Sequence, residues 1–278
     1  MNTLNACPDI RLERLLLCTD GSEFSEGAVR EAISIAKRCN SKLYVISVVE
    51  INPELEAYAP GLVETIEKDT GRDLEGIKER AEKEGVTCET ITHKGEEPYR
   101  YIVKEASGLK ADLIIMGRRG RTDINRLMMG SVTARVIGHT ACNVLVVPRS
   151  AVFKCKKILI ATDGSEFSSK AVHDALDIAT ACESEVVIVS VASNESEVRE
   201  AEGLVREACK MAGEKGIKVT TGTPVGTVYE MIIDLAEKEN IDLIVVGSHG
   251  KTGLKRLLMG SVAERVIGHA SCTVLVVK

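Results

Sequence analysis

Short runs of Val, Ile and Leu recur along the chain, and longer amphipathic stretches separate them. Apolar runs of this length with helices between them are typical of strands buried on both faces of a parallel sheet. The pattern predicts strands near 15–19, 43–49, 86–92, 113–116 and 144–147, and again near 158–161, 186–191, 217–221, 243–246 and 274–277. Helices are expected at 25–38, 62–84, after residue 98 and at 131–137, then at 168–181, 195–215, 227–239 and 261–267. The sequence therefore predicts an α/β protein with helices on both faces of its sheets.

The second half of the chain repeats the first. Residues 19–25 return unchanged at 162–168, and residues 117–147 return at 247–277 with 19 of 31 positions identical. Two blocks repeated in the same order indicate a duplication. We therefore predict two tandem, doubly wound domains with five parallel strands each, over residues 1–149 and 152–278. The first half carries about a dozen extra residues between 48 and 95, where segment 50–61 with its two prolines is expected to form a loop.

Composition and charge exclude several classes of protein. The chain has 278 residues and a net charge of −5, so it lacks the basic face that binding to nucleic acid needs. No apolar run approaches the ~20 residues that span a bilayer, and the first residues lack the apolar core of a signal peptide. We expect a cytoplasmic protein that binds no membrane. Nine cysteines and five histidines show no CxxC or HExxH spacing, and neither a disulfide framework nor a metal site is expected.

Polar blocks that occur in both halves follow the first and fourth predicted strands. Asp20 and Asp163 follow the first strand of each half, and a Gly-x2-Gly-x9-Gly-Ser element follows the fourth. Ligands of open α/β sheets bind at the carboxyl ends of strands, glycines let the backbone approach a ligand, and N–H groups at the start of a helix attract anions. The spacing matches neither GxGxxG nor GxxxxGK[ST]. It indicates a phosphate cradle, with the aspartates available to a base or ribose.

The aspartate, the glycine element and the closing VLVV strand resemble the universal stress protein family over both halves. The resemblance implies a Rossmann-like fold of the adenine nucleotide alpha hydrolase type, with strand order 3-2-1-4-5 in each half. It also implies ATP or AMP bound between strands one and four, with Mg²⁺ accompanying ATP. In the nucleotide-binding branch of the family the aspartate contacts adenosine, and the glycines and the start of the next helix surround the phosphates.

The resemblance implies a role for particular residues of both halves. Val48 and Val191 would meet adenine through backbone groups, and Met116 and Val246 would line the ribose side. The candidate nucleotide-binding residues are Thr19, Asp20, Val48, Met116, Gly117, Arg119, Gly120, Gly130, Ser131 and Val132 in half one, and Thr162, Asp163, Val191, Val246, Gly247, His249, Gly250, Gly260, Ser261 and Val262 in half two.

Half one departs from the family pattern inside the glycine element. Arg118, Arg119 and Arg121 stand where half two has Ser, His and Lys, and Asp123 replaces a glycine. The arginines either clamp phosphates bidentately or point into solvent or a domain interface. Both alternatives stay open at the level of the sequence.

Three classes of function are compatible with these residues. The first is a regulatory or stress-response protein whose conformation or partner choice changes with bound adenine nucleotide. The second is a slow ATPase or other nucleotide hydrolase, although no catalytic residue is identified, because no base stands beside the expected phosphates. The third is an interaction scaffold without a ligand, which the intact glycines of both halves disfavour.

The last strand of each half is expected at a sheet edge. An exposed apolar edge strand promotes association unless it is paired. We predict that residues 144–147 and 274–277 pair antiparallel within one chain, which makes the protein an internal pseudo-dimer, and that two chains associate further into a homodimer.

Overall fold

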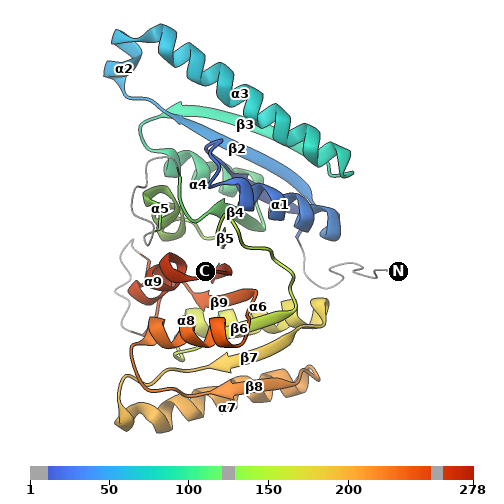
Figure 1. Cartoon of the computed structure of the whole chain (residues 1–278), viewed down its shortest axis with the longest axis vertical. Coiled ribbons are helices and arrows are strands. Elements are labelled where there is room, and N and C mark those ends of the chain that lie inside the picture. Colours follow the sequence, from blue (N-terminus) through green and yellow to red (C-terminus); the bar gives the residue numbers. More distant parts are fainter. Residues whose placement is uncertain (1–11, 121–128, 252–258) are drawn as a thin grey trace.

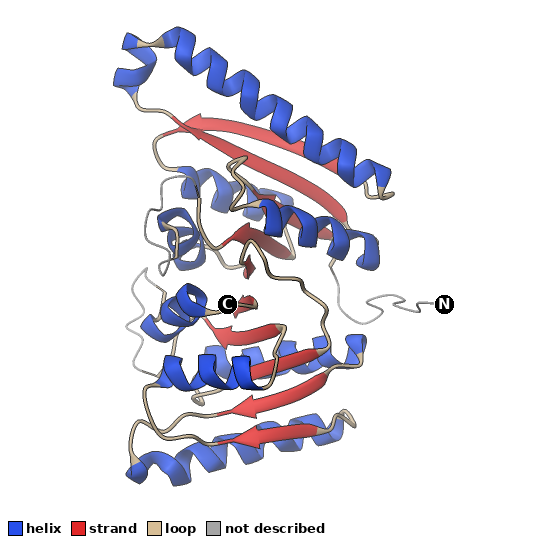
Figure 2. Ribbon diagram, viewed as in Figure 1, coloured by secondary structure: helices blue, strands red, loops and turns tan. Residues whose placement is uncertain are grey.

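The computed structural model describes residues 12–120, 129–251 and 259–278. These residues form a ten-stranded sheet. The N-terminal half is stacked end to end on the C-terminal half (Figure 1). Helices cover both faces of the sheet, as Figure 2 shows. The predicted α/β class is confirmed.

Half one supplies ten of the described elements. In chain order they are β1 (Arg14–Cys18), α1 (Glu26–Cys39), β2 (Lys42–Glu50), α2 (Pro53–Tyr58), α3 (Pro60–Lys83), β3 (Cys88–Gly95), α4 (Pro98–Leu109), β4 (Leu113–Gly117), α5 (Ser131–His139) and β5 (Asn143–Val147).

Half two repeats the series. Its elements are β6 (Lys157–Ala161), α6 (Glu166–Cys182), β7 (Glu185–Val189), a 3₁₀ turn (Glu195–Glu197), α7 (Val198–Glu214), β8 (Val219–Gly222), α8 (Val228–Lys238), β9 (Leu243–Gly247), α9 (Ser261–His269) and β10 (Thr273–Val277).

The strands lie in the order β3-β2-β1-β4-β5-β10-β9-β6-β7-β8. All pairs within a half are parallel, so each half has the predicted order 3-2-1-4-5. The two edge strands meet antiparallel, with Val144 opposite Val276 and Leu145 opposite Leu275. The predicted pairing within one chain is confirmed, and it joins the two sheets into one.

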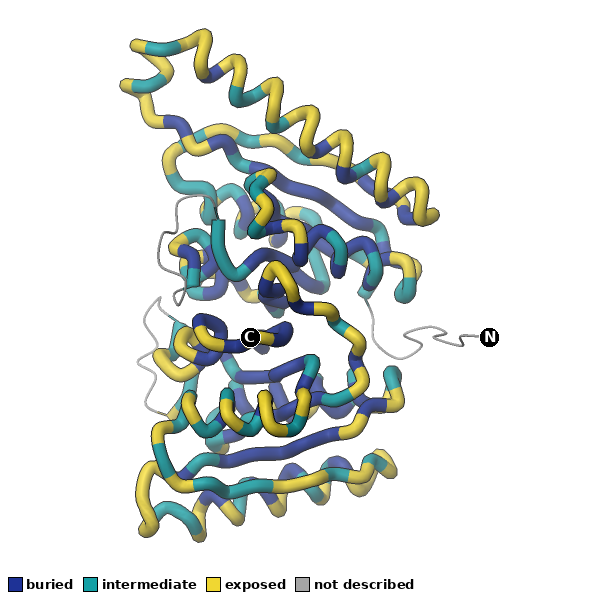
Figure 3. The backbone as a smooth tube through the Cα atoms, in the orientation of Figure 1, coloured by how far each residue is buried: buried dark blue, intermediate teal, exposed yellow. Residues whose placement is uncertain are grey.

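Alternate residues of each strand enter two apolar layers. Leu15 and Leu17 of β1 face the layer under α1, α3, α6 and α7, whereas Leu16 faces the layer under α4, α5, α8 and α9. All three side chains have no solvent exposure, and full burial of such a side chain contributes about 1.5–3 kcal/mol. Figure 3 shows the buried central strands between the helix layers.

The insertion of half one is helical, so the expectation of a loop over residues 50–61 is wrong. Pro53 and Pro60 each occupy the first turn of a helix, α2 and α3, where a missing N–H and a fixed φ are favourable. The Asn52 side chain accepts the Leu55 N–H (2.7 Å) and caps α2. Helix α3 has 24 residues against 17 in α7, and its extra turns extend beyond the carboxyl edge of the sheet (Figure 1).

Two further observations bear on the sequence predictions. Cys39, the last residue of α1, is disulfide-bonded, which the spacing of the cysteines did not predict.

Within the described ranges, no helix is both long and apolar enough to cross a membrane. The limits of the two domains, 1–149 and 152–278, stay a prediction.

Candidate functional site

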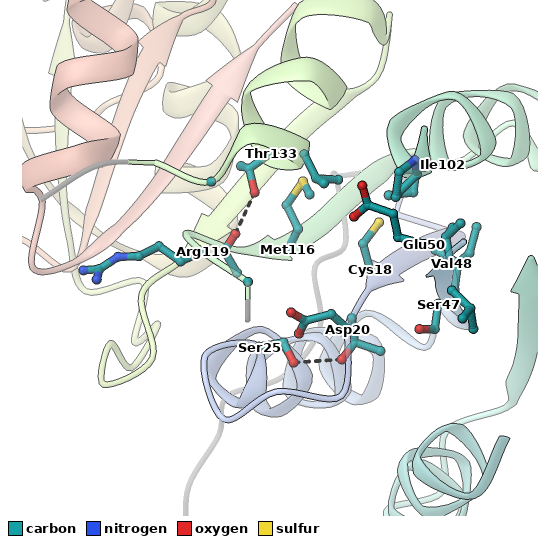
Figure 4. Close-up of a pocket in the computed structure, with 18 of the residues that line it drawn as sticks. Cys18, Asp20, Ser25, Ser47, Val48, Glu50, Ile102, Met116, Arg119 and Thr133 are labelled. Atoms are coloured by element: carbon teal, nitrogen blue, oxygen red, sulfur yellow. Dashed lines mark hydrogen bonds between the residues drawn. The ribbon is translucent and has the colours of Figure 1, made fainter. Parts of the chain in front are cut away.

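A pocket of about 410 Å³ opens at the carboxyl ends of β1, β2 and β4 in half one. All of the half-one candidates line it (Figure 4). They come from the turn after β1, the end of β2, the end of β4 with the glycine element, and the start of α5. The sequence reasoning therefore selected residues that the fold brings together.

The turn after β1 is held by its own side chains. The Asp20 carboxylate accepts hydrogen bonds from the Ser22 N–H (3.0 Å) and the Ser22 hydroxyl (2.6 Å) at Oδ1. The buried Thr19 hydroxyl lies 2.8 Å from the Ser25 hydroxyl and accepts the Gly21 N–H. Thr19 therefore fixes the turn to the start of α1, whereas the Asp20 side chain reaches the pocket.

Strand β2 continues past the end of β1, which exposes part of its edge. The Thr19 N–H donates to the Ile46 carbonyl (3.0 Å) where β1 ends, while β2 stays paired with β3 as far as Glu50. Amide groups of alternate residues face the same edge of a parallel strand. The N–H and C=O of Val48 therefore face the space that β1 has left, as a planar base would require.

The close packing of the loops also requires glycine at the first two positions of the element. A Cβ at Gly117 would lie 3.0 Å from the Phe24 carbonyl oxygen, because the start of α1 packs on the end of β4. A Cβ at Gly120 would lie 2.8 Å from Asp20 Oδ2. Glycine at these positions thus lets the loops of β1 and β4 meet. A bulky substitution at Gly120 would displace Asp20 whether or not a ligand binds.

The start of α5 is fixed over the end of β4. The Gly130 N–H donates to the Arg118 carbonyl (2.8 Å), and the Thr133 hydroxyl donates to the Gly117 carbonyl (3.0 Å). N–H groups in the first turn of a helix have no acceptor within the helix, and the helix dipole favours an anion there. The backbone of Ser131 and Val132 supplies these N–H groups at the pocket wall.

The two described arginines of the element, Arg118 and Arg119, extend in different directions. Arg118 crosses to half two, where Nη1 donates to the carbonyls of Gly268 (3.1 Å) and Ala270 (2.9 Å) at the end of α9. Arg118 therefore belongs to the domain interface. In Figure 4 the Arg119 side chain extends away from Asp20 and Met116, although its backbone lines the pocket. Arg121 and Asp123 lie outside the described residues.

Half two brings the matching loops together as well. Asp163 accepts the Ser165 N–H (3.0 Å) and hydroxyl (2.6 Å) at Oδ1, and the Lys251 N–H (3.0 Å) at Oδ2. Burial raises the pKa of Asp163, but the hydrogen bonds from Ser165 and Lys251 outweigh it and hold the pKa below its ordinary value. A Cβ at Gly250 would lie 2.5 Å from Asp163 Oδ2.

The remaining half-two candidates occupy positions equivalent to those in half one. The Thr162 hydroxyl lies 3.2 Å from that of Ser168, and the backbone of Val191 faces the edge at which β6 has ended. Val246 is buried, and the His249 ring packs against Phe167 with centroids 5.2 Å apart. A Cβ at Gly247 would lie 2.7 Å from the Phe167 backbone, and one at Gly260 would lie 3.2 Å from the Ser248 carbonyl oxygen. Ser261 and Val262 open α9.

Helix α7 stands directly over the turn after β6. A Cβ at Gly164 would lie 2.6 Å from Leu204 of α7. The Lys251 ammonium pairs with the Glu200 carboxylate of the same helix. In half one, the longer helix α3 contributes Ile66 and Thr70 to the wall of the pocket.

The sequence reasoning missed several residues of the pocket wall. Ile66 and Thr70 come from α3, and Glu50 is the last residue of β2. In Figure 4 the Glu50 carboxylate points into the space that Met116 and Cys18 also face. The strand pattern could have identified Glu50, because it shares an edge with Val48. The α3 residues depend on where the longer helix of half one packs.

The model of the universal stress protein family matches residues 11–148, 154–203 and 192–278. The chain belongs to the universal stress protein family. Universal stress protein MJ0531 of Methanocaldococcus jannaschii is 42% identical in an alignment 139 residues long, which covers 44% of this chain and 82% of that protein. Universal stress protein Slr1230 of Synechocystis is 25% identical and aligns with 95% of this chain and 99% of its own length. The chain is thus a tandem universal stress protein.

Solved structures of universal stress proteins share the fold. One from Archaeoglobus fulgidus superposes with a TM-score of 0.80 at 23% identity, over 97% of this chain and 99% of its own. A universal stress protein solved in complex with cAMP is 26% identical and covers 44% of this chain and 97% of its own, with a TM-score of 0.39.

Proposed function

We propose that half one binds an adenine nucleotide, ATP or AMP, and that the protein acts as a regulatory, nucleotide-binding stress-response protein of the cytoplasm. The observation that carries the proposal is the pocket of half one, whose walls combine an exposed strand edge, a carboxylate and the start of a helix. Its volume of about 410 Å³ lies within the ~300–1,000 Å³ of small-molecule sites.

The pocket walls suit the three parts of a nucleotide. The backbone of Val48 offers one N–H donor and one C=O acceptor to the edge of adenine. Asp20, which lines the pocket, would accept hydrogen bonds from the ribose or base. The N–H groups of Ser131 and Val132 would donate to the phosphates, as helix starts do at many anion sites. Mg²⁺ would accompany ATP at the phosphates.

Phosphate recognition in this proposal rests on backbone N–H groups. Arg118 donates to carbonyls at the C-terminal end of α9, and the Arg119 side chain extends away from the pocket (Figure 4). An exposed charged contact contributes about 1 kcal/mol or less. We therefore expect the start of α5 to matter more than either arginine.

The proposal extends to half two with weaker binding. The same turn, strand edge and helix start are present there, but Leu204 and the Lys251–Glu200 pair stand over the turn. A ligand has to displace them, and the free energy of that displacement reduces affinity. Association of two chains into a homodimer remains a prediction.

Calorimetric titration of the full chain with ATP and with AMP tests the proposal. We expect one site of higher affinity per chain and a second, weaker one. Phosphate release, followed in the same samples, tests the alternative of a slow ATPase. Absence of heat and of any nucleotide in the protein as purified would favour the scaffold without a ligand and would overturn the proposal.

A further inference from the structure

Two thiols lie side by side where the halves of the chain are joined. Cys155 belongs to the segment between β5 and β6, and Cys182 is the last residue of α6. The Cys155 S–H donates a hydrogen bond to the Cys182 sulfur. The Ser184 hydroxyl donates to the Cys155 carbonyl (2.6 Å) and lies 3.8 Å from Cys155 Sγ. Ser184 thereby holds Cys155 against the chain two residues beyond Cys182.

The two thiols differ in exposure and in acidity. Cys155 is 2% exposed, whereas Cys182 is partly exposed. The hydrogen bond from Cys155 lowers the pKa of the Cys182 thiol; burial opposes this effect, and the nearby Arg38 adds to it. The same hydrogen bond and burial raise the pKa of Cys155. Cysteines that sense oxidants combine partial exposure, a favoured thiolate and a neighbouring second cysteine.

The repeat supplies an independent observation. Cys39 ends α1 as Cys182 ends α6, and Cys39 is disulfide-bonded. A cysteine at this position of the fold therefore forms a disulfide in one half already. Cys155 also adopts a left-handed backbone with φ of 53°, which is uncommon outside glycine.

We propose that Cys155 and Cys182 are a redox-active pair that a hydroperoxide oxidises to a disulfide within the chain. The proposal is independent of nucleotide binding. Cys182 is the residue oxidised first, because it is the more exposed of the two and its sulfur accepts the hydrogen bond. Cys155 is the resolving residue.

The oxidation balances with hydrogen peroxide as the oxidant. The Cys182 thiolate attacks one peroxide oxygen, an S–O bond forms, the O–O bond breaks, and the departing hydroxide takes a proton to give water. The Cys155 sulfur then attacks the Cys182 sulfenic acid. An S–S bond forms, the S–O bond breaks, and the Cys155 proton completes a second water. The two thiols together lose two electrons and two protons.

The disulfide would fix the joining segment to α6. Phe153 of this segment lies under the Arg38 guanidinium of half one, 5.4 Å from the ring centroid, and Ala151 accepts a hydrogen bond from Arg30. The segment therefore already contacts α1. Oxidation would add a covalent link to half two.

Peptide mapping of the full chain tests the proposal. Protein reduced with dithiothreitol is treated with equimolar hydrogen peroxide, alkylated and digested. We expect a Cys155–Cys182 crosslinked peptide that dithiothreitol reverses. The C155S variant should instead accumulate Cys182 sulfenic acid, which dimedone traps. Oxidation should raise the Tm of the wild type by about 5–10 °C more than that of the variant.

The C209S variant is the matched control. Cys209 is another partly exposed thiol, and burial raises its pKa. This variant should form the Cys155–Cys182 crosslink at the wild-type rate. The proposal is overturned if both thiols are recovered alkylated after oxidation, or if Cys182 reacts with peroxide no faster than Cys209.

Discussion

Arg118 is expected to stabilise the contact between the two halves. Its guanidinium donates to two carbonyls at the end of α9, with N···O distances of 3.1 and 2.9 Å. A cation at this end of a helix also interacts favourably with the helix dipole. Burial, and then the neighbouring Arg119, lower the pKa of Arg118, and its Nε has no partner among the described residues. The burial of the charge and the unpaired Nε both reduce the net stabilisation that Arg118 provides.

Removal of the Arg118 side chain should therefore destabilise the protein measurably. Hydrogen bonds to a charged group contribute about 1.5–3 kcal/mol each. The free energy of desolvating the guanidinium offsets part of the stabilisation from these two bonds. We expect R118A to lower the free energy of unfolding by about 2–3 kcal/mol. At about 2–4 °C per kcal/mol, the Tm should fall by about 4–12 °C in calorimetry.

The control for this substitution is another arginine near the interface. Arg149 forms an exposed ion pair with Glu23 at 2.7 Å, and such pairs contribute about 0–1 kcal/mol. R149A should thus lower the Tm far less than R118A. Equal effects of the two substitutions would refute the assignment of Arg118 to the interface.

Two further predictions follow from the packing of the loops. G247A should lower the free energy of unfolding in urea by about 1–3 kcal/mol, because the new Cβ would meet the Phe167 backbone at 2.7 Å. The control G76A, at a helix position with nothing within 4 Å, should raise it by about 0.5–1 kcal/mol. A G247A protein more stable than G76A would contradict the packing of these loops. Asp163 has a pKa below its ordinary value of 3.8, so its ionised form stabilises the fold above that pH and this stability is lost as the pH falls. D163N should therefore lose less stability than the wild type between about pH 5 and pH 2, measured by urea unfolding at each pH.

Local patterns were sufficient for the sheet and for much of the pocket. The apolar runs and the repeat predicted the strands, and the unpaired edges of residues 144–147 and 274–277 predicted their antiparallel contact. The pocket followed from strand ends, because parallel strands bring their carboxyl ends to one edge. Glu50 could have been added on the same basis.

The remaining features depend on contacts between distant segments. Two prolines in segment 50–61 indicated a loop, although proline in the first turn of a helix gives the same sequence. The position of Arg118 depends on how β5 meets β10, and the wall formed by Thr70 depends on where α3 packs. No periodicity in the sequence encodes these distances.

Calorimetric titration of S131P tests most directly whether the start of α5 binds phosphate through its backbone. Gly130 has ψ of 143°, which suits a residue before proline, and proline is favourable at the first helical position. The substitution removes one N–H and leaves the helix intact, whereas S131A keeps that N–H. We predict that S131P weakens ATP and AMP binding in half one by about 10–100-fold, and that S131A and the equivalent S261P leave this site within about threefold. Wild-type affinity in S131P, with an unchanged Tm, would contradict the account.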